Sequence, residues 1–367
     1  MNHAPHIRNF KVLGRLTIAA VYFLILVGGI VRASGAGLGC PDWPTCFGRW
    51  MPPTSASELP ENYQQIYADR GYSNTRFNAT KTWTEYLNRL TGVTIGFLIF
   101  LTLLFSLSFR ASDPAIFYLS LGTFILVGFQ GWLGARVVAS QLHPGMITVH
   151  MIVALIIVAL LIYAITRSQI SVLKQSSRPD LHARFNIVLI VAMAMTLLQV
   201  VMGTQVRESV DTIAAAYQFE NRTLWRSHFP FIFYIHRSFS ALILFTNAWL
   251  IWNLVRKAGS GSFLYRCGIF LGLFIATGIA TGITMDRLDI PVFAQPVHLL
   301  MATLVFGMQF FIYVSLSYST GERATAASER DPQFSGSTVF NSAGSKPNSA
   351  NLVLNDSVTV GKETLRK

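Results

Sequence analysis

Long apolar runs separated by short polar segments make up most of this 367-residue chain. An α-helix needs about 20 apolar residues to cross the hydrocarbon core of a bilayer. Eight runs are near that length, at about 16–31, 86–108, 115–135, 146–166, 185–206, 231–255, 268–285 and 292–318. These runs lack the regular alternation of apolar and polar residues that marks a transmembrane β-barrel. The pattern predicts an all-α integral membrane protein with eight transmembrane helices.

The composition agrees with a membrane location. Hydrophobic residues make up 52% of the chain and charged residues only 13%, whereas charged residues are about 25% of a typical soluble domain. The formal net charge of +12 is also compatible with nucleic-acid binding, so the distribution of the charge decides between the two explanations.

The positive charge follows the predicted loops. Basic residues lie before the first run and in every second loop, where acidic residues are rare: Arg8, Lys11, Arg15, Arg110, Arg167, Lys174, Arg178, Arg184, Arg256, Lys257 and Arg266. The other loops mix both signs, with Asp42 and Glu58 in the first and Asp211 in the third. Because basic loops stay in the cytoplasm, both termini are predicted to be cytoplasmic. The charge reflects topology, and no nucleic-acid partner is expected.

Comparison of the chain with itself indicates an internal repeat. Motifs of the second, third and fourth runs recur 148 residues later in the sixth, seventh and eighth runs. The matched pairs are YLNR at 86–89 with YIHR at 234–237, VH at 149–150 with VH at 297–298, and Gly134 with Gly282. We predict two four-helix halves, 1–170 with its long outer loop 33–84, and 171–318, related by a pseudo-twofold axis along the membrane normal.

The two ends of the chain need separate interpretation. The first run follows basic residues and ends in the small-residue stretch VRASGAG at 31–37, which also fits a secretory signal peptide. The repeat requires this segment as a helix, so we retain it. From residue 319 the chain is polar and rich in Ser, Asn and Ala. Residues 319–367 are therefore predicted to form a disordered cytoplasmic tail.

Four polar residues form one layer across the predicted bundle. Each lies a few residues into an even-numbered helix, counted from the outer side: Asn88, His150, His236 and His298. A rise of 1.5 Å per residue puts them roughly 5–10 Å below the outer surface. A lone histidine in a span is usually a hydrogen-bonded core residue. Three at one depth, in repeat-related places, indicate a site, and paired imidazoles on facing helices are how bundles hold heme iron.

Zinc is the alternative metal for the pair in the second half. A structural zinc site has four ligands, with Cys, Asp or Glu commonly among them. The sequence places no such residue beside His236 and His298. Bis-histidine heme is therefore favoured over zinc.

Arginines near the same layer are candidate partners for heme propionates, which bind guanidinium groups well. Arg89 and Arg237 directly follow the ligand positions, and Arg32 and Arg207 end the first and fifth runs. Arginines near helix ends also reach for lipid phosphates. That alternative explains Arg32 and Arg207 equally well, and the repeated pair less well.

These motifs, together with GLGCPDWPTC at 37–46, resemble the heme A synthase family over about residues 12–318. The resemblance implies that heme b is a resident cofactor on His236 and His298. It also implies that the first half takes heme O, with His150 at the substrate iron, and oxidises a ring methyl to a formyl group. Glu85 matches the family's glutamate and is the candidate catalytic residue. The implied partners are heme O, an unidentified electron donor, heme O synthase and terminal oxidase assembly factors.

One position departs from the family pattern. Asn88 stands where the family commonly has a second histidine in the first half, and asparagine is a poor iron ligand. The substrate heme is then five-coordinate through His150, or has water or another residue opposite. An open face suits oxygen chemistry, because a bis-histidine iron has no site for oxygen. It equally suits a half that only binds heme.

Glu85 and the cysteines have structural alternatives. Thr82 to Glu85 reads as a capping box, whereas a proton-handling Glu85 would share a helix face with position 88. Cys40 and Cys46 lie in the outer loop, where disulfides persist. They are either a structural staple or, as the resemblance implies, an exchangeable thiol pair above the substrate site.

Two other functions remain open. A two-heme membrane cytochrome would pass electrons to or from quinone, and a heme carrier would deliver heme to an oxidase. The first should have two complete bis-histidine sites, and the second has no evident need for Glu85. About fifteen residues precede the first run, too few for a mitochondrial transit peptide, so we expect a bacterial cytoplasmic membrane.

Overall fold

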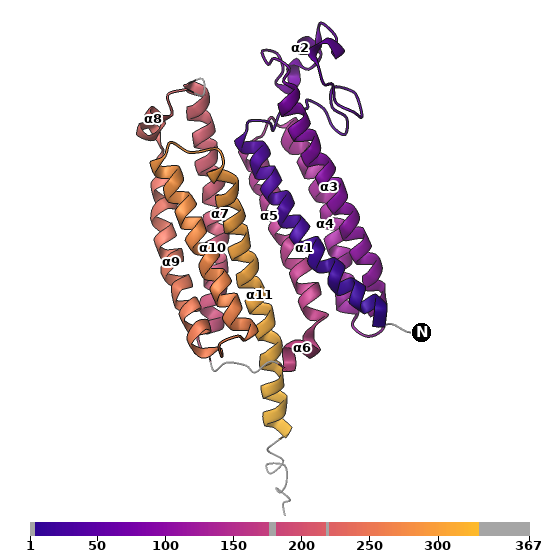
Figure 1. Cartoon of the computed structure of the whole chain (residues 1–367), viewed down its shortest axis with the longest axis vertical. Helices are drawn as coiled ribbons and strands as arrows, with labels where there is room; N and C mark the ends of the chain where they lie inside the picture. Colours follow the sequence, from indigo (N-terminus) through magenta and orange to yellow (C-terminus); the bar gives the residue numbers. More distant parts are fainter. Residues whose placement is uncertain (1–3, 176–180, 218–219, 330–367) are drawn as a thin grey trace, which may run out of the picture. The chain divides into compact units, whose positions relative to one another are not determined.

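The computed structural model describes residues 4–175, 181–217 and 220–329, and the regular secondary structure of these residues is helical, with no strand. Each predicted run coincides with one long helix to within two residues, or extends less far than that helix (Figure 1). The eight are α1 (Ala4–Ala33), α3 (Ala79–Ser106), α4 (Pro114–Ala139), α5 (Pro144–Arg167), α7 (Phe185–Ala216), α9 (Phe231–Lys257), α10 (Phe263–Arg287) and α11 (Ala294–Glu329). The predicted all-α membrane fold is confirmed.

Two hydrophobic clusters each take residues from four helices. The first contains Val21, Ile99, Leu133 and Val158 from α1, α3, α4 and α5. The second contains Leu189, Leu250, Leu271 and Ile312 from α7, α9, α10 and α11. Leu155, Val200 and Phe306 connect α5 with α7 and α11. Without a hydrophobic force between helices in lipid, close packing of this kind holds a bundle together.

The helices extend beyond the apolar runs at several ends. α7 continues to Ala216, so Asp211 lies on this helix and not in the loop that the sequence predicted. α11 continues to Glu329 and so includes the first residues of the segment 319–367, whose disorder stays a prediction. The rest of that segment, 330–367, lies outside the described residues.

The start of α3 contradicts the capping box predicted at Thr82. The helix begins at Ala79, and its N-cap is Asn78, whose side chain accepts a hydrogen bond from the Lys81 amide at 3.0 Å. Asn is among the best N-cap residues because its oxygen satisfies a free amide of the first turn. Thr82 and Glu85 are therefore interior helix positions, and both are buried.

The turns before α5 and α11 share an unusual backbone. Gln141 and Leu142 both have positive φ, and so do Asp289 and Ile290, which lie 148 residues later. A β-branched residue such as Ile290 rarely adopts this conformation. Leu142 donates its amide to Val137 and Ile290 to Met285, the pattern of a Schellman C-cap. This matched geometry supports the predicted repeat, whose twofold axis stays a prediction.

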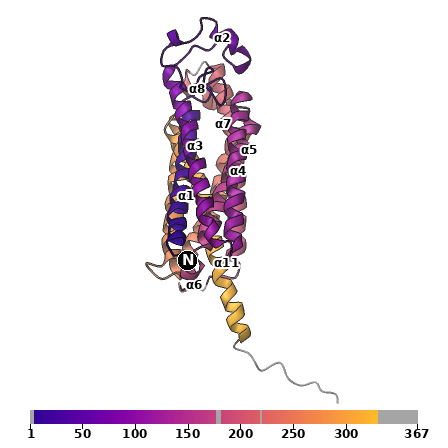
Figure 2. The same cartoon turned by 90° about the vertical axis from the view of Figure 1, so that its right-hand side faces the viewer.

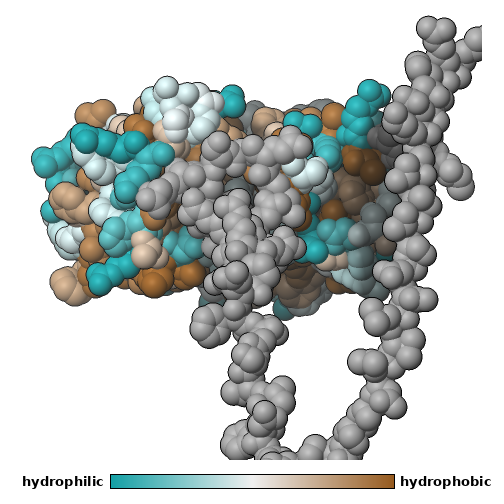
Figure 3. Space-filling model, turned by 90° about the horizontal axis from the view of Figure 1, so that it is seen from below, coloured by the Kyte–Doolittle hydropathy of each residue, from teal (hydrophilic) through white to brown (hydrophobic). Residues whose placement is uncertain are grey.

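The sides and the ends of the helices differ in polarity. Val93, Ile125 and Phe245 are among the large apolar side chains exposed along the helices, as expected for surfaces that face lipid. The 34–78 segment, with α2 (Tyr63–Ile66), lies at one end together with α8 (Arg222–Trp225), and this end is called the loop end (Figure 2). The opposite end, with α6 (Ile170–Gln175), carries hydrophilic side chains among apolar ones (Figure 3).

Candidate functional site

His236 on α9 and His298 on α11 face each other across a cavity in the second half. The cavity has a volume of about 350 Å³ and is lined mainly by apolar residues of α7, α9, α10 and α11. The two imidazole centres are 6.3 Å apart. Two imidazoles that bind one metal ion through bonds of about 2.0–2.1 Å have ring centres about 6 Å apart. The pair is therefore spaced to hold a single metal ion between the rings.

Glycines clear the space beside both rings. A Cβ on Gly282 would lie 3.2 Å from Cε1 of His298, and one on Gly203 would lie 3.4 Å from Cε1 of His236. Each imidazole therefore packs directly on the backbone of a neighbouring helix. Gly282 was one of the repeat positions in the sequence, whereas Gly203 gave no signal there.

Hydrogen bonds orient the two rings differently. Nδ1 of His298 lies 2.8 Å from the carbonyl oxygen of Gly278, an arrangement that leaves Nε2 as the ligand atom and is typical of metal-binding histidines. Nδ1 of His236 is buried without a hydrogen-bond partner among the described residues. Gln199 donates its amide to the backbone carbonyl of His236 at 3.0 Å. The donor set fits heme iron, and the described residues contain no cluster of three metal-binding side chains that zinc would prefer.

Three of the four predicted propionate arginines line this one cavity: Arg32, Arg207 and Arg237. Arg32 comes from α1, in the first half, and it meets the second half through an ion pair with Asp211 at 3.3 Å. From the sequence, Asp211 was interpreted only as one of the charges of a loop. No feature of the sequence indicated that α1 would line the cavity of the second half.

The polar residues of the first half form a less complete set. Nε2 of Gln130 on α4 donates to the carbonyl of His150 on α5 at 2.9 Å. Side-chain polar atoms of Asn88, Gln130 and His150 are buried without hydrogen-bond partners among the described residues. Gly28 lies beside Asn88 and Gly134 beside His150. Buried polar atoms are normally satisfied, so these unpaired atoms point to a polar ligand here. The sequence missed Gln130 and Gln199.

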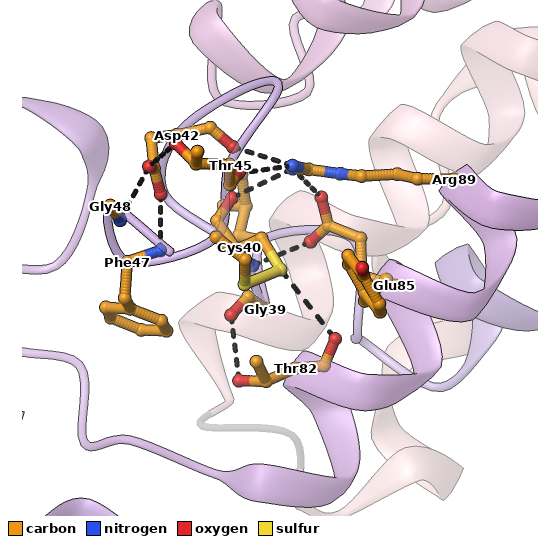
Figure 4. Close-up of a disulfide and its surroundings, with 12 residues drawn as sticks. Gly39, Cys40, Asp42, Thr45, Phe47, Gly48, Thr82, Glu85 and Arg89 are labelled. Atoms are coloured by element: carbon orange, nitrogen blue, oxygen red, sulfur yellow. Dashed lines mark hydrogen bonds and ion pairs between the residues drawn. A yellow bond between two sulfur atoms is a disulfide. The ribbon is translucent and has the colours of Figure 1, made fainter. Parts of the chain in front are cut away.

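A loop closed by a disulfide lies against α3 above this half. Cys40 and Cys46 form the disulfide, and both are fully buried. The amide of Cys40 donates to Oε2 of Glu85 at 2.9 Å, and the hydroxyl of Thr82 donates to the carbonyl of Gly39 at 2.9 Å (Figure 4). A Cβ on Gly39 would lie 2.5 Å from the Lys81 carbonyl oxygen. Only glycine therefore allows the loop backbone to approach α3 this closely.

Arg89 holds the same loop from the side. Its Nη1 donates to the carbonyls of Asp42 at 2.6 Å and Thr45 at 3.0 Å. Its Nη2 donates to the carbonyl of Cys40 at 3.2 Å and to Oε1 of Glu85 at 2.5 Å (Figure 4). These bonds use the terminal nitrogens of the guanidinium group. The geometry favours a loop-positioning role for Arg89 over the predicted contact with a propionate.

The interior of the loop is ordered by its own contacts. The Asp42 carboxylate accepts the amides of Phe47 at 2.6 Å and Gly48 at 2.8 Å. The Phe47 ring packs edge-on against the rings of Tyr67 and Tyr72. Burial raises the pKa of Tyr72 above its ordinary value, so its hydroxyl stays protonated and donates to the backbone of the loop. The loop is therefore a packed structure fixed to Glu85.

Arg89→Lys is expected to loosen this loop and leave the second half intact. A lysine carries one compact charge and cannot reach the same four acceptors, and the lost charge-assisted bonds cost about 2–3 kcal/mol. Limited proteolysis of the 34–78 segment should become faster, while absorbance of any heme bound at His236 stays unchanged. Loss of heme with an unchanged cleavage rate would instead support the propionate role.

Comparison with known proteins agrees with these features. The family model of the cytochrome oxidase assembly protein, COX15-CtaA, matches residues 11–310. A heme A synthase of Shewanella oneidensis is 32% identical over 46% of this chain and 48% of its own length, so this chain matches about half of that relative. Heme A synthases of Methylobacterium nodulans and another Methylobacterium are 28% and 27% identical over 79% and 80% of this chain, and 87% and 88% of their own lengths. The chain therefore belongs to the COX15-CtaA family of cytochrome oxidase assembly proteins.

Proposed function

We propose that this protein is a heme A synthase, an oxidoreductase that converts the ring methyl of heme O to a formyl group. The asymmetry between the halves carries the proposal. One half has two facing imidazoles, and the other has His150, Asn88 and a buried glutamate beneath a disulfide loop. Relatives that carry the name heme A synthase align with most of the chain.

The second half is proposed as the resident heme b site. His236 and His298 would hold the iron, and Gly203 and Gly282 leave room for their rings. Arg32, Arg207 and Arg237, at the loop end of the cavity, would bind the propionates. Heme bound by two histidines supplies one-electron redox chemistry without an open site for oxygen.

The first half is proposed as the substrate site for heme O. Conversion of a methyl to a formyl group adds one oxygen atom to the carbon and removes protons and electrons; with water as the oxygen source, R–CH3 + H2O gives R–CHO + 4 H+ + 4 e−. The site therefore needs an oxygen source, a proton acceptor and an electron acceptor. Glu85 is the buried carboxylate on α3 one turn before Asn88, and its ionised form is stabilised by Arg89 and by the Cys40 amide. We propose that Glu85 accepts protons there, while His150 binds the substrate iron.

The finer assignments follow from this arrangement. The disulfide loop would cover the substrate site, and its bond to Glu85 allows a redox-active role for Cys40 and Cys46 as well as a structural one. The basic loops support a topology with both termini in the cytoplasm, and we propose a bacterial cytoplasmic membrane as the location. Heme O synthase, oxidase assembly factors and an electron donor remain the proposed partners.

Extraction of the bound hemes tests the proposal. The protein would be expressed with a supply of heme O and purified, and the non-covalent hemes would be extracted and identified by mass. Heme A, or its hydroxylated precursor, beside heme b is the expected result. Heme b alone, in two equivalents, would contradict the synthase and favour the cytochrome or the carrier.

Asn88→His is expected to change the iron coordination in the first half. Position 88 matches His236 in the repeat, and Oδ1 of Asn88 is buried beside Gly28. A histidine there would supply a second axial ligand opposite His150, giving a six-coordinate, low-spin substrate heme with no site for oxygen. Optical spectra should show the added low-spin component, and heme A formation should fall. An unchanged spectrum would show that positions 88 and 150 do not face one iron.

A further inference from the structure

Two carboxylates engage the arginines at the loop end of the second-half cavity. Asp211 pairs with Arg32 at 3.3 Å and with Arg207 at 2.7 Å. Asp286, at the end of α10, pairs with Arg226 at 3.2 Å and with Arg237 at 3.5 Å. Under the proposed function a heme propionate would use Arg32, Arg207 and Arg237, which line the cavity. Asp211 therefore shares two arginines with the expected ligand, and Asp286 shares one, Arg237.

Asp286 is the more buried of the two carboxylates and lines the cavity itself. Its side chain is 12% exposed, against 42% for Asp211. Oδ1 of Asp286 is buried and lies 3.2 Å from Nη2 of Arg226. This contact is an ion pair without hydrogen-bond geometry, and the described residues offer Oδ1 no hydrogen bond. The side chains of Arg226 and Arg237 are about half exposed. The carboxylate is therefore fixed, whereas the arginines have room to turn toward a second anion.

We propose that Asp286 competes with a heme propionate for Arg237, and so weakens the binding of a tetrapyrrole dicarboxylate at this site. Two carboxylates that share the same cations repel each other. The charge of the more buried carboxylate, Asp286, repels a propionate more strongly because solvent screens it less. Asp211 acts in the same way on Arg32 and Arg207, and its greater exposure makes its effect smaller. The proposal rests on the proposed function of the cavity as a heme site.

A purely structural ion pair makes the opposite prediction. If Asp286 only held Arg237 in place, removal of its charge would let the arginine leave the site, and heme would bind less tightly. If Asp286 competes, removal of its charge frees Arg237 for the propionate, and heme binds more tightly. The sign of the change in affinity separates the two roles.

The experiment measures the affinity of the heme-depleted full chain in detergent for ferric heme b and for its dimethyl ester. The ester has no propionate charge, so an effect exerted through the propionates disappears with it. Asp286→Asn is expected to lower the Kd for heme b by about three- to tenfold and to leave the Kd for the ester unchanged. Asp286→Glu keeps the charge and should retain the affinity of the unchanged protein.

Asp113→Asn is the matched control, because Asp113 pairs with Arg167 at 2.8 Å and is also partly buried, but does not line the cavity. It should change neither Kd. Asp211→Asn should show the same gain as Asp286→Asn but smaller, and it tests the competition independently if the Asp286 variant does not fold. Weaker heme binding by the asparagine variants, or an equal gain for the ester, would overturn the proposal. Failure of the unchanged protein to bind heme b would overturn the heme site itself.

Discussion

Glu85→Gln is expected to stop the formation of heme A and leave heme b in place. The Cys40 amide donates to the Glu85 carboxylate at 2.9 Å, and the side-chain oxygen of glutamine can still accept this hydrogen bond. Glutamine cannot, however, take up a proton at neutral pH. Loss of a general base typically lowers the rate by about 10²–10⁴-fold. The measurement is the ratio of heme A to heme O extracted from protein expressed with heme O.

Glu58→Gln is the matched control for this variant. Glu58 is a carboxylate of the 34–78 segment that is also paired with an arginine, Arg49 at 3.0 Å, but it is exposed. It should retain heme A formation. A Glu85→Gln protein that makes heme A at the normal rate would show that Glu85 serves only to anchor the loop. Glu85→Ala would then be the variant that loses activity, because it also removes the acceptor of the Cys40 amide.

His236→Gly is expected to abolish the low-spin heme b spectrum. His236 supplies one of the two facing imidazoles, and even loss of a residue that supports a metal ligand lowers metal affinity about 10–100-fold. Loss of the ligand itself should lower the affinity for heme by at least the same factor. Heme A formation should also fall, because the electron path through the second half is broken.

Rescue of the glycine variant by free imidazole is the more specific test of ligation by His236. The glycine variant leaves a space of the shape of the missing ring, so added imidazole should restore the low-spin spectrum. His228→Ala is the control, since His228 is an exposed histidine near the loop end. It should leave the spectrum unchanged. If His236→Gly retains its low-spin spectrum without imidazole, the paired-ligand assignment is wrong.

Much of the fold follows from local sequence. Each apolar run is long enough to satisfy its own backbone hydrogen bonds as a helix across the bilayer, so eight helices could be placed from hydropathy alone. The helix ends were less predictable: a single side chain, Asn78, caps α3, and α7 continues to Ala216, beyond the end of its apolar run.

The candidate site was only partly predictable. The repeat placed His236 and His298 at one depth, and the structure brings their rings together. Gln130 and Gln199 were missed because a single glutamine in an apolar run has no periodic signal. Asp286 was missed because its arginine neighbours come from the 3-10 turn after α8, from α9 and from its own helix, and only the packing of these segments makes it a shared carboxylate.

The eight long apolar helices, the depth of the histidines and the cysteine pair were predictable because they depend on composition and spacing within single segments. Which charged groups meet was not predictable and is known only from the packing of the helices. Arg32 lies at the cavity of the second half, and Arg89 and Glu85 bind the disulfide loop. The physical reason is that an ion pair or a buried hydrogen bond depends on distances of a few ångströms between helices far apart in sequence, and helical periodicity does not specify them.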